Sequence, residues 1–222
     1  MADIELLHTQ ITERLGDAIL HAQLAYGELT IEIAPEHVQE VCLILRDDPQ
    51  FAFNLFVDVC GVDYLHYGLS EWETESATFS GFERGVDMSA MNHPPHTRPR
   101  FAAVYHLLSL TQNHRIRVRA FLDAQQPKVD SVVDIWPAAN WFEREAFDLF
   151  GIEFKGHPDL RRILTDYGFI GHPFRKDFPL IGNVEARYDA ASQRVVYEPV
   201  SIEPRILEPK VIRRDNRYQV GE

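Results

Sequence analysis

Two apolar runs joined by a four-residue turn are the feature that most constrains the fold of this chain. Residues 101–110 and 115–122 are rich in β-branched and aromatic side chains, and residues 111–114 separate them. A connection this short between two strand-like runs predicts an antiparallel hairpin. Because helical patterns occur before and after this hairpin, the chain is expected to adopt an α+β fold.

The second strand of this hairpin predicts a sheet with two different faces. Its apolar residues alternate with Arg115, Arg117 and Arg119, and successive side chains of a strand point to opposite sides. One face is therefore apolar, and the other carries three guanidinium groups. These arginines either lie on a solvated face, or pair with Glu32 or Asp58 on neighbouring strands, or contact an acidic partner surface.

Further helices and strands are expected before this hairpin. Apolar residues at helical spacing predict an amphipathic N-terminal helix, and Cys42 lies on the apolar stripe of a second helix that begins at Pro35. Strands are expected over residues 29–33 and 51–60. The side chains expected on one face of the second of these strands are Phe51, Phe53, Leu55, Val57 and Val59.

The element order predicts a core domain over residues 1–155. Within it, residues 66–100 have no steady period and are expected to form a loop insertion. A helix over residues 131–150, interrupted near Pro137, is expected to complete the domain. We therefore expect a mainly antiparallel sheet of about four strands with flanking helices.

The chain changes character after residue 151. Residues 151–182 contain many glycines and prolines and hold no regular element long enough to form its own core, yet they are rich in aromatic side chains. A disordered linker would not be this aromatic. The segment is best interpreted as an arm that lies on another surface, followed by a small hairpin. We assign residues 156–222 to an extended partner-binding arm and tail.

Composition argues against several classes of function. The net charge is −12, and all of it comes from the first hundred residues, which hold 17 acids and 5 bases, so nucleic acid is not an expected partner. The longest apolar runs are only a few residues, so no transmembrane segment is expected. The acidic start MADIELLHTQ is not typical of a signal peptide and favours a bacterial cytoplasmic location.

The residues also predict that the chain has no cofactor or metal of its own. Its two cysteines, Cys42 and Cys60, form no CxxC pair, and iron–sulfur clusters usually need four thiolates. No GxGxxG or Walker pattern is present. His157 and His172 each precede a proline, and neither forms the HExxH geometry of a helical zinc site. These histidines are interpreted as surface or interface residues.

The helix before the arm holds the densest cluster of charged and aromatic side chains. Arg144 and Asp148 are four residues apart and can pair. Glu143 falls on the apolar side, where a carboxylate must find a partner or be protonated. Either Glu143 is a catalytic acid or base with a raised pKa, or it anchors the arm through a buried pair with Arg161 or Arg162.

Residues 143–180 resemble the signature of a known family. The stretch contains ERE and DLF, then HPDLRRILTDYGF and GHPFRKDFPL. By these motifs the chain resembles the 30-kilodalton subunit family of bacterial NADH:quinone oxidoreductase, respiratory complex I. The signature and expected partner-binding positions are Glu143, Arg144, Glu145, Asp148, Phe150, Gly151, His157, Arg161, Arg162, Asp166, Tyr167, Gly168, Gly171, Arg175, Lys176 and Asp177.

The resemblance implies a structural subunit without catalytic, cofactor-binding or metal-binding residues of its own. It implies a place in the peripheral arm of the enzyme, on the cytoplasmic side of the inner membrane. There a family member contacts the 49-kilodalton quinone-site subunit and the neighbouring cluster-bearing subunit. The whole enzyme passes electrons from NADH, via FMN and iron–sulfur clusters in partner subunits, to quinone and translocates protons. The arm is expected to wrap the neighbouring subunit through its charged residues.

Other interpretations remain open on the sequence alone. An equivalent subunit of a related membrane-bound hydrogenase-type complex would share these motifs. A protein of a different class, a free soluble enzyme using Glu143 and Glu145, is the second alternative. Because these two carboxylates are two residues apart on a helix, they do not face each other, which counts against a catalytic pair. A general adaptor for another large complex is the third.

Overall fold

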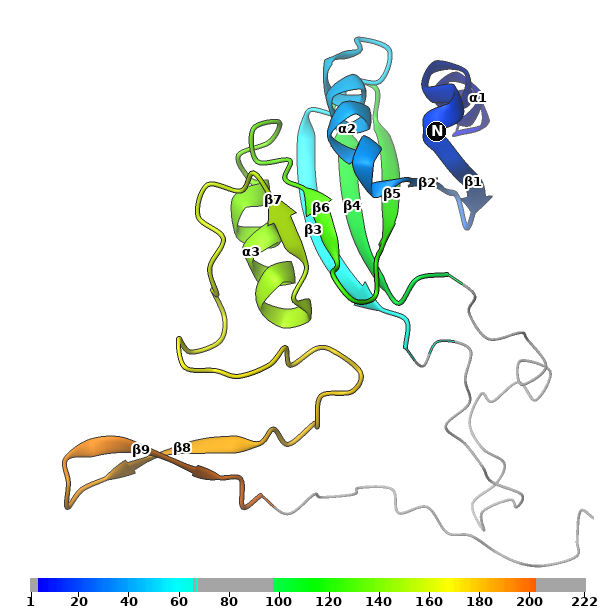
Figure 1. The fold of residues 1–222 in the computed structure, drawn as a ribbon. Coiled ribbons are helices and arrows are strands. Elements are labelled where there is room, and N and C mark those ends of the chain that lie inside the picture. Colours follow the sequence, from blue (N-terminus) through cyan, green and yellow to red (C-terminus); the bar gives the residue numbers. More distant parts are fainter. Residues whose placement is uncertain (1–3, 66, 68–97, 203–222) are drawn as a thin grey trace, which may run out of the picture. The chain divides into compact units, whose positions relative to one another are not determined.

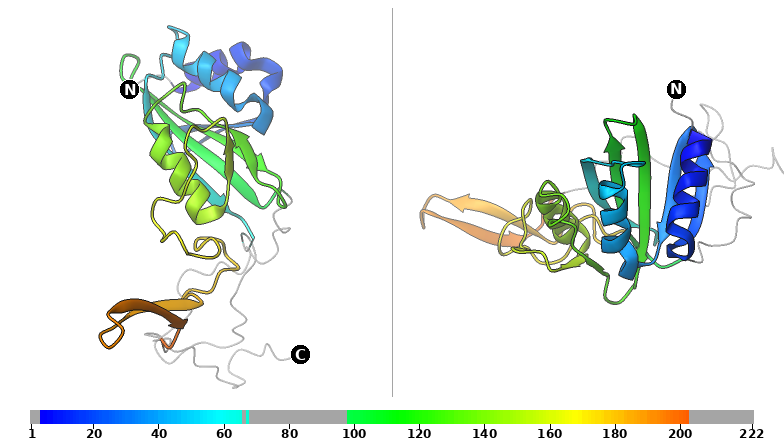
Figure 2. Two further views of the ribbon diagram at one scale, coloured as in Figure 1. Left: turned by 60° about the vertical axis from the view of Figure 1, so that its left-hand side comes forward. Right: turned by 90° about the horizontal axis from the view of Figure 1, so that it is seen from above.

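The computed structural model describes residues 4–65, 67 and 98–202 of the chain (Figure 1 and Figure 2). These residues form two compact units. The first contains the residues up to 65 and residues 98–178, and the second contains residue 67 and residues 179–202. The elements of the first unit are α1 (Ile4–Leu15), β1 (Ile19–Ala25), β2 (Glu28–Ile33), α2 (Val38–Asp47), β3 (Leu55–Asp63), β4 (Phe101–Ser109), β5 (His114–Leu122), β6 (Lys128–Asp130), α3 (Ala139–Phe150) and β7 (Glu153–Lys155). The second unit holds β8 (Val184–Asp189) and β9 (Arg194–Pro199).

The first unit is built on a five-stranded sheet in the order β1-β2-β5-β4-β3. Neighbouring strands are antiparallel except for β2 and β5, which are parallel. The expected α+β class and the hairpin of β4 and β5 are confirmed. The sheet has one strand more than the four or so expected. Strand β1 lies at the sheet edge, and its exposed and half-buried side chains lack the alternation that identifies a strand in a sequence.

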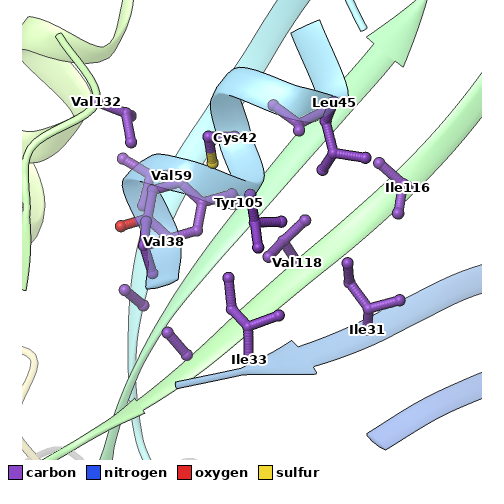
Figure 3. Packing of buried hydrophobic residues seen from close by; sticks show 14 of the residues in the cluster. Ile31, Ile33, Val38, Cys42, Leu45, Val59, Tyr105, Ile116, Val118 and Val132 are labelled. Atoms are coloured by element: carbon purple, nitrogen blue, oxygen red, sulfur yellow. The ribbon is translucent and has the colours of Figure 1, made fainter. Parts of the chain in front are cut away.

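Helices α1 and α2 lie on one face of this sheet and close the core (Figure 2). Figure 3 shows Cys42 and Leu45 of α2 beside Tyr105 and Val118 of the sheet. All four side chains are fully buried. Burial of a valine or leucine side chain such as Val118 or Leu45 contributes about 1.5–3 kcal/mol. Burial raises the pKa of the Cys42 thiol to about 12, so this side chain acts as a core residue, as predicted.

The opposite face of the sheet carries the arginines of β5. Arg119 forms an ion pair with Glu32 of β2, one of the two neighbouring acids expected. Arg117 does not bind the other acid directly. Its Nε lies 3.0 Å from Nε2 of His106, and the Nδ1 atom of the same ring lies 2.6 Å from Oδ1 of Asp58. This face is therefore organised by ion pairs and hydrogen bonds between neighbouring strands.

Strand β3 begins later than expected and presents a different face. The two phenylalanines that precede it are buried, as predicted. Leu55 and Val57 were expected on the same face as these phenylalanines, and this is wrong, because the two residues are 40% and 46% exposed. A register irregularity after Phe56 interrupts the alternation, so Phe56 and Val59 point into the core instead.

Gly61 of β3 lies against the last residue of α3. A Cβ atom at this position would be 2.5 Å from Cδ2 and 2.8 Å from Cγ of Phe150. That ring cannot easily shift, because it also packs edge-on against Phe174 with ring centroids 5.9 Å apart. We expect Gly61→Ala to lower the free energy of unfolding by about 1–3 kcal/mol in urea denaturation.

The matched control for this substitution is Gly168→Ala. No atom lies within 4 Å of a Cβ built on Gly168. This variant should therefore keep the stability of the wild-type chain to within about 0.5 kcal/mol. Equal stability of the two alanine variants would contradict the close approach of β3 to α3.

Helix α3 is shorter than the helix predicted over residues 131–150. It begins at Ala139, and the residues before Pro137 form a turn in which the carbonyl of Val132 accepts hydrogen bonds from two backbone N–H groups. Proline has no N–H to donate to a helix, which explains the late start. Gly151 ends α3 with φ 75°, a left-handed conformation that glycine adopts without strain. The short parallel pair of β6 and β7 was not predicted.

Candidate functional site: the arm and its anchors

Asp148 of α3 binds the arm through a fully buried carboxylate. Its Oδ2 accepts hydrogen bonds from the backbone N–H groups of Ile163, Leu164 and Thr165 at 2.8–3.0 Å. Its Oδ1 accepts from the Thr165 hydroxyl and from Nη1 of Arg162, the latter at 2.8 Å. Burial alone would raise the pKa of Asp148, but these donors outweigh it and hold the pKa well below its usual range.

Arg144 reinforces the same attachment one turn earlier in α3. Its Nε donates to the carbonyl of Arg161 at 3.1 Å, and its Nη2 donates to the carbonyl of Arg162 at 3.0 Å. The expected pairing of Arg144 with Asp148 is therefore wrong. Both side chains bind the backbone of the arm instead of each other. Residues 161–165 belong to no helix or strand, so their carbonyl and N–H groups need other hydrogen-bond partners.

The arm also caps the end of α3. The last carbonyls of a helix lack partners within it. Here the carbonyls of residues 148–150 accept from Nδ1 of His172 at 2.9 Å, the backbone N–H of Phe174 at 3.1 Å and Nε of Arg175 at 2.7 Å. Gly151 lets the arm approach this closely, because a Cβ there would lie 2.5 Å from Nη2 of Arg175.

Asp63 anchors the end of this attached segment. Nε and Nη2 of Arg100 donate to its two oxygens at 2.9 and 2.7 Å, and the backbone N–H groups of Leu65 and Lys176 donate at 3.0 and 2.9 Å. Arg100 also pairs with Asp177 at 3.0 Å. Burial opposes the ionised form, yet the Arg100 hydrogen bonds lower the pKa of Asp63. The arm, the end of β3 and the segment before β4 therefore meet at one carboxylate.

Glu143 is fully buried and forms no ion pair with an arginine of the described chain. Its Oε2 accepts from the Ser131 hydroxyl at 2.6 Å, and its Oε1 accepts from the backbone N–H of Val132 at 2.8 Å. The expected pair with Arg161 or Arg162 is wrong, because Arg161 pairs with Asp159 and Arg162 pairs with Asp148. Burial raises the pKa of Glu143 to about 7, despite these two hydrogen bonds, which favour the charged form.

The signature residues therefore divide into two groups. One group is buried or half-buried, and all its members except Glu143, which binds Ser131 and Val132, attach the arm within the chain. It comprises Glu143, Arg144, Asp148, Phe150, Gly151, His157, Arg162, Gly171 and Arg175. The other is exposed and comprises Glu145, Arg161, Asp166, Tyr167, Gly168, Lys176 and Asp177. Asp63, Arg100 and Thr165 were missed, because no local spacing relates them to the residues they bind.

Large apolar side chains of the attached arm point into solvent. Tyr167 is 92% exposed and Ile170 is 87% exposed, and Leu164 and Phe174 are also more than half exposed. Trp141, on α3, is exposed as well. Large apolar side chains that stay exposed on a segment held by hydrogen bonds are typical of protein–protein interfaces. The arm thus has a buried side that holds it in place and an exposed side that carries large apolar groups.

Within the described ranges, the side chains offer no cluster of three or more His, Cys, Asp and Glu positioned to hold a metal ion. No helix in the described part of the chain has the length and apolar character needed to cross a bilayer.

Comparison with known proteins identifies the family. Residues 31–184 match the family model of the respiratory-chain NADH dehydrogenase, 30 Kd subunit. An NADH-quinone oxidoreductase subunit from Coxiella burnetii (strain RSA 493 / Nine Mile phase I) is 58% identical, over 100% of this chain and 98% of the relative. A subunit of the same enzyme from Halorhodospira halophila (strain DSM 244 / SL1) is 54% identical, over 98% of this chain and 94% of the relative.

Two solved structures have a similar fold. A trypsin-resistant fragment of Nqo5 is similar with a TM-score of 0.50 and 27% identity, covering 71% of this chain and 98% of the fragment. The structure of an archaeal membrane-bound sulfane sulfur reductase has a similar chain, with a TM-score of 0.51 over 80% of this chain and 86% of that one. At 19% identity this second likeness concerns the fold alone. The chain belongs to the family of the 30-kilodalton subunit of the respiratory-chain NADH dehydrogenase.

Proposed function

We propose that the chain is a structural subunit of the peripheral arm of a proton-translocating NADH:quinone oxidoreductase, with no redox group of its own. Relatives that share 54–58% identity over nearly the whole chain are subunits of NADH-quinone oxidoreductase. In this role the chain supports electron transfer from NADH, via FMN and iron–sulfur clusters in partner subunits, to quinone. It would do so by holding neighbouring subunits in place.

The arm is the feature that best supports a structural role. It is attached to the rest of the chain by hydrogen bonds, and large apolar side chains on it are exposed. Asp148, Arg144 and Asp63 fix its backbone within the chain. Tyr167 and Ile170 remain almost completely exposed. Because an aromatic and an aliphatic side chain held in this way lose little conformational entropy on binding, they are suited to be anchor residues of an interface.

The proposed partners of this arm are the 49-kilodalton quinone-site subunit and the neighbouring cluster-bearing subunit. The proposed location is the cytoplasmic side of the bacterial inner membrane, peripheral to the bilayer. Membership of the family supports both assignments. The charged residues of the signature that are exposed, among them Arg161, Asp166 and Lys176, would form the polar rim of the interface.

The alternatives are less well supported. A free enzyme using Glu143 would need this carboxylate to meet a substrate, but its side chain is fully buried and both oxygens accept hydrogen bonds from the chain itself. A related respiratory membrane complex shares the fold at only 19% identity, whereas relatives from NADH-quinone oxidoreductase share more than half of the residues.

The test uses the tagged chain in its native host. We expect Tyr167→Ser combined with Ile170→Ser to lower the amount of assembled, NADH-oxidising enzyme in gently extracted membranes by about tenfold, because two anchor side chains are lost. The matched control is Leu20→Ser combined with Tyr26→Ser, which removes two exposed apolar side chains, one in β1 and one in the turn after it. Strand β1 is the opposite edge of the sheet from β3.

Two results would contradict the proposal. One is a wild-type chain that is recovered only as a small species without flavin, iron–sulfur signals or oxidation of NADH by quinone. The other is normal assembly of the arm variant with loss of electron transfer, which would show that the arm acts in the reaction itself and not as a scaffold.

A further inference from the structure

The hairpin of β8 and β9 has two faces of opposite chemistry. Its register places Val184 opposite Pro199, Ala186 opposite Tyr197, and Tyr188 opposite Val195. Because side chains alternate along each strand, these three pairs share one face. That face carries no charged side chain and is apolar except for two tyrosine hydroxyls, and Val184, Tyr188, Val195 and Tyr197 are each more than half exposed.

The other face of the hairpin is polar, and its side chains form hydrogen bonds and ion pairs within the chain. Nε of Arg187 binds Oε1 of Glu198 at 2.9 Å, across the two strands. The hydroxyl of Ser201 donates to Glu185 at 2.8 Å. Val196 is the only apolar residue on this face, and its cross-strand partner is Arg187. The polar face therefore needs no partner and is suited to water.

The turn prevents the two faces from being exchanged. The carboxylate of Asp189 accepts from the backbone N–H groups of Ala191 and Ser192 at 3.1 and 3.3 Å, and from the Ser192 hydroxyl at 2.6 Å. Gln193 completes the turn with φ 53°. A slip of one residue would move every side chain to the opposite face, so a turn held in this way fixes which face is apolar.

We propose that this apolar face docks onto an apolar patch of another subunit of the same enzyme, with the polar face turned to solvent. The inference rests on the proposed function and extends it from residues 161–178 of the arm to a second contact surface, the hairpin of β8 and β9. A two-stranded hairpin is at best marginally stable in water without a third strand or a covering surface. Burying Tyr188 and Tyr197 on a partner would supply that cover.

The size and charge of the hairpin favour this occupant over a second copy of the chain or a lipid surface. One face of six side chains offers on the order of 500 Å², below the roughly 800 Å² per partner that stable interfaces need. It therefore suits a secondary contact in an assembly that is held together elsewhere. The polar face carries three acids and two bases, so it lacks the basic excess that binds anionic lipid.

The decisive experiment compares two adjacent valines that lie on opposite faces. We expect Val195→Asp, on the apolar face, to lower the fraction of tagged chain recovered in the assembled enzyme by about tenfold. Val196→Asp, on the polar face, should match wild type, because the new carboxylate lies opposite Arg187. A photo-crosslinking residue at position 197 in the otherwise unchanged chain provides a second measurement, and we expect it to label another subunit.

The outcomes separate this inference from the proposed function. If the wild-type chain joins the enzyme but both aspartate variants assemble equally well, and position 197 labels no other subunit, the inference is wrong and the proposed function stands. Crosslinks between two copies of the chain, or to lipid, would also overturn the inference. A wild-type chain that joins no NADH-oxidising assembly would overturn the proposed function itself.

Discussion

Replacing Asp148 with asparagine is expected to lower the free energy of unfolding by about 3–5 kcal/mol and to release the arm. The carboxylate accepts five hydrogen bonds in a fully buried position. An asparagine amide has only one acceptor oxygen, so its NH₂ group would face either the backbone N–H groups of residues 163–165 or Arg162. Buried donors would then face each other without an acceptor. Urea denaturation measures the loss of stability, and limited proteolysis within residues 156–178 measures release of the arm.

Asp166→Asn is the matched control, because it makes the same chemical change in the arm at an exposed side chain. Its stability and protease resistance should equal those of the wild-type chain. The pH dependence gives a second check. Because the folded-state pKa of Asp148 is lowered, its contribution is complete above the ordinary pKa of 3.8 and is lost as the pH falls below that value. An Asp148→Asn variant as stable as Asp166→Asn would refute the role of Asp148 as the anchor.

The second large effect is expected at Glu143 and depends on pH. Its folded-state pKa is raised from 4.5 to about 7, so the folded chain binds a proton more tightly than the unfolded chain. The stabilisation is complete below pH 4.5 and is lost as the pH rises through about 7. The gap between the two values, 4.5 and about 7, corresponds to about 3 kcal/mol.

Glu143→Gln should remove this pH dependence. Its amide oxygen can accept from the N–H of Val132, its NH₂ group can donate to the Ser131 hydroxyl, and it cannot ionise. Urea denaturation from pH 4 to pH 8 should give similar stabilities for both proteins at the acid end and a more stable variant at pH 8. Glu145→Gln, exposed on the same helix, should follow the wild type. Parallel curves for wild type and Glu143→Gln would disprove a raised pKa.

Local patterns were sufficient for much of the fold. The alternation of arginine with apolar residues over 115–122 and the short turn before it identify the hairpin of β4 and β5, because strand periodicity and turn length are local properties. Helical spacing identifies α1 and α2 for the same reason. Edge strand β1 and the three-residue strands β6 and β7 escape this kind of reasoning, because an exposed or very short strand leaves no periodic signal.

The candidate site shows the complementary limit. Its charged residues can be recognised in the sequence, and Glu143 is correctly placed on the apolar side of a helix. The partner of each side chain cannot be predicted from the sequence. Asp148 binds Arg162 and Thr165 instead of Arg144, and Asp63 binds Arg100, 37 residues away. Helical spacing predicts which residues of one helix are close enough to interact. It does not predict that donors from the folded arm will bind a side chain in place of its neighbour on the helix.

The sequence thus determines the family, the fold class and the chemistry of the arm, because motif and periodicity are carried by neighbouring residues. Which residues hold the arm and which face a partner is decided only in three dimensions. Buried carboxylates at positions 63, 143 and 148 each need donors, and the donors come from segments that folding brings together. Leaving a buried charge without hydrogen-bond partners costs free energy, so the arrangement of segments that supplies the partners is favoured. This free-energy cost arises only when the charge is buried, so it is a property of the tertiary structure.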